Sequence, residues 1–146
     1  MVTQINETRK AAFFHVFNIG RIRKFLSFDT VQTLVNAFVI SQLDYCNSIL
    51  FGLPNTELQM LQRVQNTVAR LICNMNKFNH ITPILVKLHW LPVRYRINFK
   101  ILLTTFKVIH GLAPKYLSEL FTCKTKCNYN LRSTSEILLQ QPRIKT

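Results

Sequence analysis

The chain has 146 residues, of which 48% are apolar, with 11 phenylalanines and only 3 glycines. This length suits one domain with a self-supporting core, and the composition excludes intrinsic disorder and a turn-rich all-β sandwich. The formal net charge is +13, from 19 Lys and Arg against 6 Asp and Glu, and because such an imbalance is self-repelling we expect a polyanionic partner.

Helical periodicity dominates the first half of the chain. It predicts a first helix over about 8–18 that continues over 21–26 after a kink at Ile19 and Gly20, and a second helix over 27–51. The hydroxyl of Ser27 is expected to cap this second helix. Gly52 and Pro54 are expected to end that helix. Its apolar positions cover more than one stripe, so we expect the helix over 27–51 to be the central one.

The second half continues the helical pattern. It predicts helices over about 55–73, 82–88, 93–110 and 115–121. Asn55 and Thr82 are expected to cap two of them, and Gly111 has the structural role of ending the long helix over 93–110. Periodicity fades after residue 121. We therefore predict an all-α fold: a domain over 1–121, built as a compact array of five or six helices, and a poorly ordered tail over 122–146.

The sequence contains no feature of a signal peptide. The longest apolar stretch, 34–40, is far short of the ~20 residues of a membrane span. We expect an intracellular protein with no membrane partner, nuclear or cytoplasmic, whose four cysteines are free thiols. Cys46 and Cys73 are expected on apolar helix faces, where a thiol is inert. Cys123 and Cys127 could begin a zinc site with His110 or His89, but the second pair lacks ligand-like spacing. Neither a metal nor another cofactor is expected.

Basic residues are concentrated where carboxylates are absent. No Asp or Glu occurs between Glu57 and Glu119. On the long helix, Arg96, Lys100 and Lys107 fall within about 40° of one another on one face. A charged stripe is often only a solvated face, but without interleaved acids it favours contact with phosphates. The residues predicted to contact a nucleic-acid backbone are Arg63, Arg70, Arg94, Arg96, Lys100 and Lys107.

Three other residues are expected to have structural roles. Asp44 is expected either to pair with Arg63 or Arg70, holding the register of two helices, or to be a surface charge. Trp90 is expected to fill the core at a corner, the alternative being a platform on which a base stacks. Pro92 forces that corner, because the residue before a proline avoids the helical region.

The carboxylates do not form a polymerase or nuclease centre. Template-directed polymerisation needs two divalent cations about 3.5 to 4 Å apart, held by clustered carboxylates. Asp29 and Asp44 are the only aspartates, and the helix between them would separate them by roughly 22 Å. We therefore predict no catalytic residues and no enzymatic activity.

Five strings occur in a fixed order along the chain. They are RIRKFLS (21–27), SQLDYCNSIL (41–50), LQRVQNTVAR (61–70), LHWLPV (88–93) and GLAPKYL (111–117). In order and spacing they resemble the region after the palm in reverse transcriptases of Jockey-like LINE (non-LTR) retrotransposons, over about 13–143. The resemblance implies a helical, thumb-like region that grips DNA, RNA or a hybrid duplex. It also implies that Met1 is an internal start and that the chain is truncated at Thr146.

Two further functions remain open on the sequence. A fragment that has lost its palm would expose an apolar face, which could self-associate or bind another chain. A helix-turn-helix regulator would read DNA bases with polar side chains on the helix over 55–73. The candidates for that role are Gln59, Gln62, Arg63 and Asn66. Sequence-independent nucleic-acid binding is the function that we favour.

Overall fold

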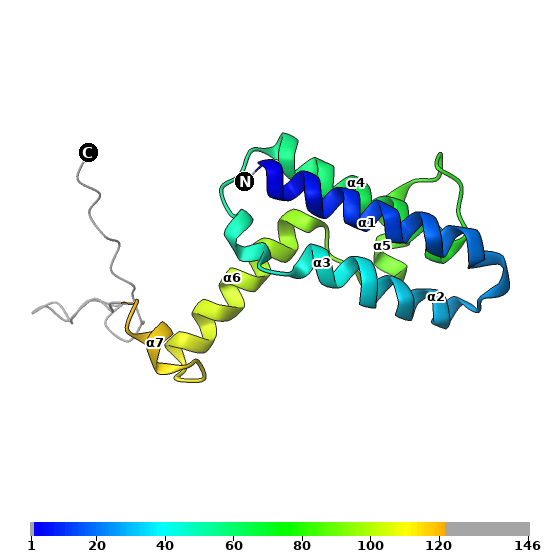
Figure 1. Cartoon of the computed structure of the whole chain (residues 1–146). Coiled ribbons are helices and arrows are strands. Elements are labelled where there is room, and N and C mark those ends of the chain that lie inside the picture. The colour runs from blue at the N-terminus through cyan, green and yellow to red at the C-terminus, as the bar shows by residue number, and fades with distance from the viewer. Residues whose placement is uncertain (1, 122–146) are drawn as a thin grey trace, which may run out of the picture. The chain divides into compact units, whose positions relative to one another are not determined.

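A computed structural model describes residues 2–121, and all regular structure in that range is helical (Figure 1). The predicted all-α fold is confirmed. The elements are α1 (Val2–Ile22), η1 (Arg23–Phe25), α2 (Phe28–Val35), η2 (Asn36–Ile40), α3 (Ser41–Asp44), η3 (Asn47–Leu50), α4 (Asn55–Cys73), α5 (Ile81–Lys87), α6 (Val93–Ile109) and α7 (Lys115–Ser118). Among these described residues, no helix has the length and hydropathy to cross a membrane.

The chain divides into two compact units, Met1–Lys100 and Ile101–Thr146, and the boundary falls within α6. The predicted tail over 122–146 lies outside the described residues. The predicted domain boundary after residue 121 stays a prediction.

Helix α1 packs along α4 in the first unit, as Figure 1 shows. Its buried side chains recur at helical spacing, at Ile5, Ala12, Val16 and Ile19. Helix α1 continues through Gly20 to Ile22, so this glycine does not interrupt the helix, and the kink there stays a prediction. One glycine costs a helix only about 1 kcal/mol relative to alanine, which is less than the packing of several core side chains contributes.

The helix predicted over 27–51 begins as predicted, but it ends earlier than predicted. Ser27 caps α2, its hydroxyl accepting a hydrogen bond from the amide of Thr30 at 3.3 Å. Helical structure continues through the π-helical η2 and through α3, and stops at Asp44. Tyr45 is extended and Cys46 is left-handed, with φ of 51°. The predicted single helix over 27–51 is therefore wrong, and Cys46 is exposed instead of lying on an apolar face.

Helix α4 contacts α1, α2 and α5, and the segment over 27–51 contacts α1 and α4. The buried residues of α4 are Leu61, Val64, Gln65, Val68, Ala69 and Ile72. The predicted caps on α4 and α5 are wrong. Asn55 is already helical and follows the cap residue Pro54. Thr82 lies inside α5, whose cap residue is His80, and neither cap residue bonds through its side chain.

Three helices end in the same hydrogen-bonded turn. In each, a residue with positive φ follows the helix, namely Asn74 (51°), His89 (54°) or Gly111 (68°). The amide after that residue bonds back five positions, as from Trp90 to the carbonyl of Leu85 at 2.8 Å. This is the Schellman motif, which satisfies carbonyls that the helix end leaves unpaired.

Replacing His89 with glycine is expected to raise the free energy of unfolding by about 0.5 to 1 kcal/mol, because a left-handed conformation costs an L-residue with a Cβ about 1 to 2 kcal/mol and glycine very little. Urea unfolding followed by circular dichroism measures the change. His80→Gly is the matched control, since His80 has φ of −56° and gains nothing from glycine. Equal changes in the two variants would contradict strain at His89.

Helix α6 begins at Val93 and ends at Ile109, close to the predicted bounds. In the second unit Val108 is buried, whereas Leu102 is 67% exposed. Helix α7 ends at Ser118, three residues before its predicted end.

Candidate nucleic-acid interface

The predicted phosphate contacts have different surroundings. In the first unit, Arg63, Arg94 and Lys100 are exposed. Lys107 is also exposed, on the part of α6 that belongs to the second unit. Neither Arg63 nor Arg94 forms an ion pair with another described residue. These two arginines therefore present charge to solvent on α4 and at the start of α6.

Arg96 is instead held inside the first unit. Its Nη1 donates to Oδ2 of Asp44 at 2.7 Å, and its Nε donates to the carbonyl of Leu91 at 3.0 Å. The guanidinium carbon lies 5.7 Å from the ring centroid of Trp90. The Arg96 side chain is only 16% exposed. We therefore assign Arg96 a positioning role at the start of α6 and remove it from the phosphate contacts.

The predicted partner of Asp44 is wrong. The carboxylate pairs with Arg96, not with Arg63 or Arg70. Asn47 is a second neighbour, with Nδ2 at 3.5 Å from the other carboxylate oxygen. The helix stops at Asp44, and the side chain there reaches a residue 52 positions later in the chain. The pair fixes α3 against the beginning of α6.

A cavity of about 290 Å³ lies beside this ion pair. It is lined by Asn36, Ile40, Asp44, Asn47, Trp90, Arg96, Phe99 and Lys100. Trp90 is half-buried at its wall, and Pro92, also half-buried, follows two residues later and accepts through its carbonyl from the amide of Arg96 at 3.0 Å. The corner is thus built from backbone and guanidinium contacts, and base stacking by Trp90 stays a prediction.

Arg70 supports a loop. Its Nη2 donates to the carbonyl of Asn79 at 3.2 Å. Its Nε is buried without a hydrogen-bond partner among the described residues. The residue is half-buried and ties the end of α4 to the loop that precedes α5. Arg70 is therefore less accessible to a phosphate than Arg63, which is exposed.

A buried amide network, which the sequence did not reveal, joins α4 to the corner before α6. Gln65 is fully buried, and its Nε2 donates to the carbonyl of Leu91 at 2.8 Å. Gln62 Nε2 donates to Oε1 of Gln65 at 2.9 Å and to Oδ1 of Asn66 at 2.8 Å. The amide of Val93 donates to Oε1 of Gln62 at 2.8 Å. Glutamine at a core position of a helical pattern was the available signal.

This network bears on the helix-turn-helix alternative. Gln62 and Asn66, two of its four proposed base-reading residues, are bonded within the first unit. Only Gln59 and Arg63 of that set are exposed. A recognition helix needs several free polar side chains facing the major groove, so the structure disfavours this alternative.

Arg23 is a second residue that the sequence did not single out. Its Nε and Nη2 donate to the carbonyls of Leu71 and Ile72 at 3.0 and 2.9 Å, and its Nη1 donates to the carbonyl of Leu26 at 3.1 Å. Leu71 and Ile72 belong to the last turn of α4, where carbonyls lack intrahelical partners. Arg23 therefore caps α4 from the turn that follows α1.

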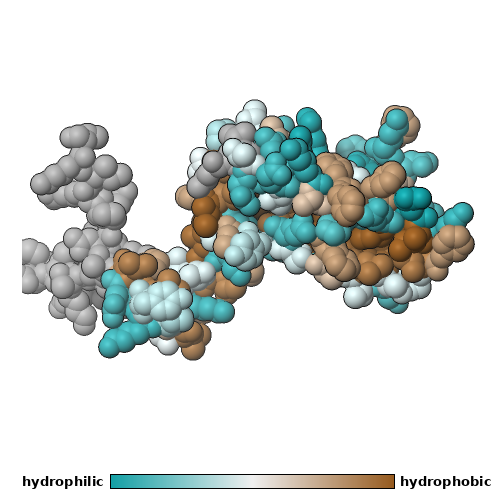
Figure 2. All heavy atoms as spheres, in the orientation of Figure 1, coloured by the Kyte–Doolittle hydropathy of each residue, from teal (hydrophilic) through white to brown (hydrophobic). Residues whose placement is uncertain are grey.

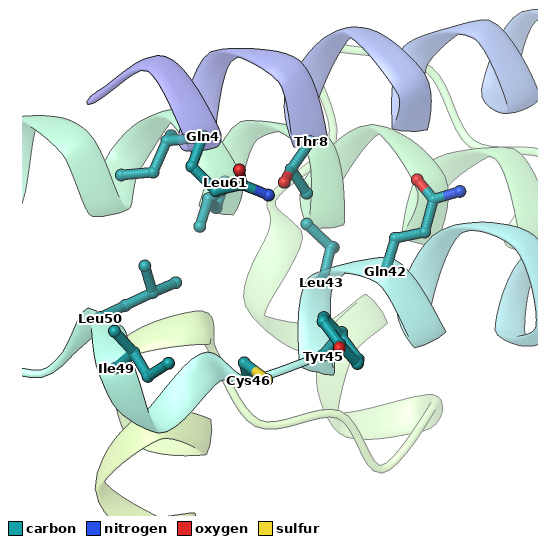
Figure 3. A pocket seen from close by; sticks show the side chains of 10 residues that line it. Gln4, Thr8, Gln42, Leu43, Tyr45, Cys46, Ile49, Leu50 and Leu61 are labelled. Atoms are coloured by element: carbon teal, nitrogen blue, oxygen red, sulfur yellow. The ribbon is translucent and has the colours of Figure 1, made fainter. Parts of the chain in front are cut away.

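Another cavity of about 290 Å³ is mostly apolar and lies between α1, α3, η3 and α4 (Figure 3). Leu43, Ile49, Leu50 and Leu61 are among its lining residues, and Gln4, Thr8 and Gln42 add polar atoms at its edge. Cys46 is also part of the lining. No charged side chain of residues 2–121 lines it, and these lining residues do not suit a phosphate.

Large apolar side chains are also exposed on the first unit. Phe14 is 63% exposed and Phe38 is 46% exposed. The centroid of the His15 ring lies 5.5 Å from that of Phe14 and 5.4 Å from that of Phe38. The predicted self-association through an apolar surface stays a prediction.

Within residues 2–121, no group of three or more His, Cys, Asp or Glu side chains is placed to hold a metal ion. Cys123 and Cys127, weighed for a zinc site, lie outside the described residues. Comparisons with models of protein families, with curated proteins and with solved structures give no match.

Proposed function

We propose that this chain is a non-catalytic helical module that binds the phosphate backbone of nucleic acids without reading their sequence. The observation that carries the proposal is its charge: +13 overall, with no carboxylate between Glu57 and Glu119. A basic surface of this kind binds a polyanion by releasing condensed counterions. Arg63 and Arg94 are the side chains of the first unit that we assign to this contact most directly.

Carboxylates are paired with part of this charge in residues 2–121. Lys10 forms an ion pair with Glu7 at 3.0 Å, and Arg96 forms one with Asp44 at 2.7 Å. Arg23 and Arg70 bond to backbone carbonyls, which leaves their charge uncompensated. An anionic partner would offset the repulsion among the remaining cations.

The amide network supports binding that does not read bases. Sequence readout requires amide or guanidinium groups that are free to bond base edges. Gln62, Gln65 and Asn66 are bonded within the first unit instead. We therefore assign the contacts to phosphates, which position a nucleic acid without carrying sequence information.

The resemblance to the region after the palm of LINE-type reverse transcriptases supports the same function, since a thumb-like segment would lie against a duplex. The proposal includes no catalysis. Asp44 is paired with Arg96, and Asp29 lies in the first turn of α2. The two aspartates are therefore on different elements and do not form a carboxylate pair.

The test is a salt titration of fluorescence anisotropy with a labelled duplex. For the double variant Arg63→Gln and Arg94→Gln, we expect the slope of log affinity against log salt to become shallower by roughly 1.8, because each phosphate contact contributes about 0.9. Glutamine is nearly as good a helix former as arginine, so helicity should be kept.

Lys10→Gln is the matched control. It also removes one positive charge from an exposed helix position, but that charge is already paired with Glu7. We expect its slope to match that of the native protein. A double variant that remains folded and keeps the native slope would show that Arg63 and Arg94 are only solvated side chains.

A further inference from the structure

Exposed phenylalanines gather at one end of the first unit. They are Phe17 (66% exposed), Phe25 (76%), Phe28 (38%) and Phe78 (85%). These rings come from four separate segments: the end of α1, η1, the start of α2 and the loop that follows α4. In Figure 2, hydrophobic and hydrophilic side chains are interspersed where α1 ends and α2 begins.

Hydrogen bonds and ring contacts bring these segments together. Arg23, which belongs to η1, bonds to the carbonyls of Leu71 and Ile72 at the end of α4. The loop with Phe78 leaves α4 at that same end. Lys87, at the end of α5, lies over the ring of Phe28 at the start of α2. The four rings therefore share one end of the helical array, which we call the aromatic end.

Each ring at the aromatic end has its own cation. Four of the five cation–ring contacts between described residues are here, and the fifth is the internal contact of Arg96 with Trp90. The pairs, with the distance from the cation to the ring centroid, are Arg21–Phe17 (5.9 Å), Lys24–Phe25 (4.9 Å), Lys77–Phe78 (4.9 Å) and Lys87–Phe28 (5.9 Å).

Negative charge is scarce in these segments. Asp29, next to Phe28, is the only carboxylate between Glu7 and Asp44 in the sequence, and the loop after α4 lies in the interval without carboxylates. An anion that approaches the aromatic end therefore meets one acidic side chain and several basic ones.

We propose that the aromatic end binds single-stranded nucleic acid, with unpaired bases stacked on the exposed phenylalanines and the intervening phosphates beside the paired cations. This inference rests on the proposed function and adds a surface and a ligand class to it. A ring next to a cation suits a nucleotide, because a base offers a π-face and its phosphate offers a negative charge. Every base has such a face, so the contact is tolerant of sequence.

The arrangement favours a single strand over a duplex or a membrane. In a duplex the bases are stacked on one another, so their faces are not open to side chains, whereas unpaired bases can be splayed onto aromatic rings. A helix that lies on a membrane places its apolar side chains along one face of that helix. Here the rings come from four segments, and one of them is on a loop.

The experiment uses the full chain, a labelled single strand of mixed sequence, a labelled duplex and vesicles containing phosphatidylserine. The variants are Phe25→Ala, Phe78→Ala and the double replacement, at the two most exposed rings of the aromatic end. Single-strand affinity is expected to fall about five- to hundredfold for each ring that stacks a base. The salt slope and the duplex affinity should not change, because no charge is removed.

Phe51→Ala is the matched control, since Phe51 is 65% exposed and precedes the opposite end of α4. It should keep the native single-strand affinity. If the double variant bound the single strand and the duplex as the native protein does, the proposal that the aromatic end binds single strands would be contradicted. The proposed function would be unaffected. Loss of vesicle binding instead of strand binding would assign the rings to a membrane. A native protein that binds neither strand nor duplex would overturn both proposals.

Discussion

Replacing Gln65 with alanine is expected to lower the free energy of unfolding by about 3 kcal/mol. The side chain is fully buried, so its removal leaves a cavity and removes two hydrogen bonds, to the carbonyl of Leu91 and from the side-chain amide of Gln62. Both groups keep one other partner, so the cost is that of two hydrogen bonds, about 0.5 to 1.5 kcal/mol each, with the cost of the cavity added. The effect is large because Gln65 joins α4 to the corner before α6.

Chemical denaturation in urea, followed by far-ultraviolet circular dichroism, measures this loss. Gln59→Ala is the matched control, because Gln59 is exposed on the same helix and surface replacements usually change stability by less than about 0.5 kcal/mol. If the two variants unfolded at the same urea concentration, the amide network would not stabilise the fold.

Replacing Arg23 with methionine is expected to cost about 2 to 3 kcal/mol. Methionine keeps much of the packing of the arginine stem but removes three hydrogen bonds to carbonyls. Hydrogen bonds from a charged donor contribute about 1.5 to 3 kcal/mol each when buried, and Arg23 is only half-buried, so the sum is discounted. A cation at the end of α4 also interacts favourably with the helix dipole.

Two further variants distinguish the effect of the helix cap from a general effect of positive charge. Arg21→Met removes a neighbouring exposed arginine and should cost less than about 0.5 kcal/mol. Arg23→Lys should restore only part of the stability, because an ammonium group cannot reach three carbonyls in the fixed fork geometry of a guanidinium. Equal stability of Arg23→Met and native protein would show that the end of α4 does not depend on this cap.

The all-α fold could be predicted because helical periodicity is local and extends along most of the chain. Local chemistry also predicted particular helix ends. Ser27 caps α2, and Gly111 takes the positive φ that ends the long helix. These features depend on residues within one turn of each other, so neighbouring sequence is sufficient.

Features that join distant segments could not be predicted in this way. Asp44 and its partner Arg96 are 52 residues apart, and Arg23 lies 48 residues from Leu71. A periodic pattern shows which face of a helix is apolar, but not which residue of another helix it meets. Arg96 therefore appeared to belong to an exposed stripe, although tertiary packing commits it to Asp44.

The break after Asp44 had no local signal either. Cysteine is not enriched in the left-handed conformation, as glycine and asparagine are, yet Cys46 adopts it. The continuous apolar pattern through this segment favoured one long helix. The chain turns there instead, and this turn sets the carboxylate of Asp44 at a helix end.

The predicted phosphate contacts differ in exposure, which the sequence pattern did not indicate. Arg63 and Arg94 are open to solvent, whereas Arg70 and Arg96 are bonded to the backbone or to Asp44. Composition indicates how much charge a chain carries, but only packing determines which charges reach a partner. The cations of the aromatic end were not among the predicted contacts. Three of them lie within four residues of their rings, and only Lys87 pairs with a ring far away in the sequence.

The most direct test of nucleic-acid binding is a salt titration of the native chain on two duplexes of unrelated sequence. The predicted result is binding at low salt with nearly equal affinity for the two duplexes, and a linear fall of log affinity with log salt whose slope is about −0.9 per phosphate contact. No binding to either duplex at low salt would contradict the proposed function. So would a preference for one sequence of more than about a thousandfold, the range that separates specific from non-specific DNA binding.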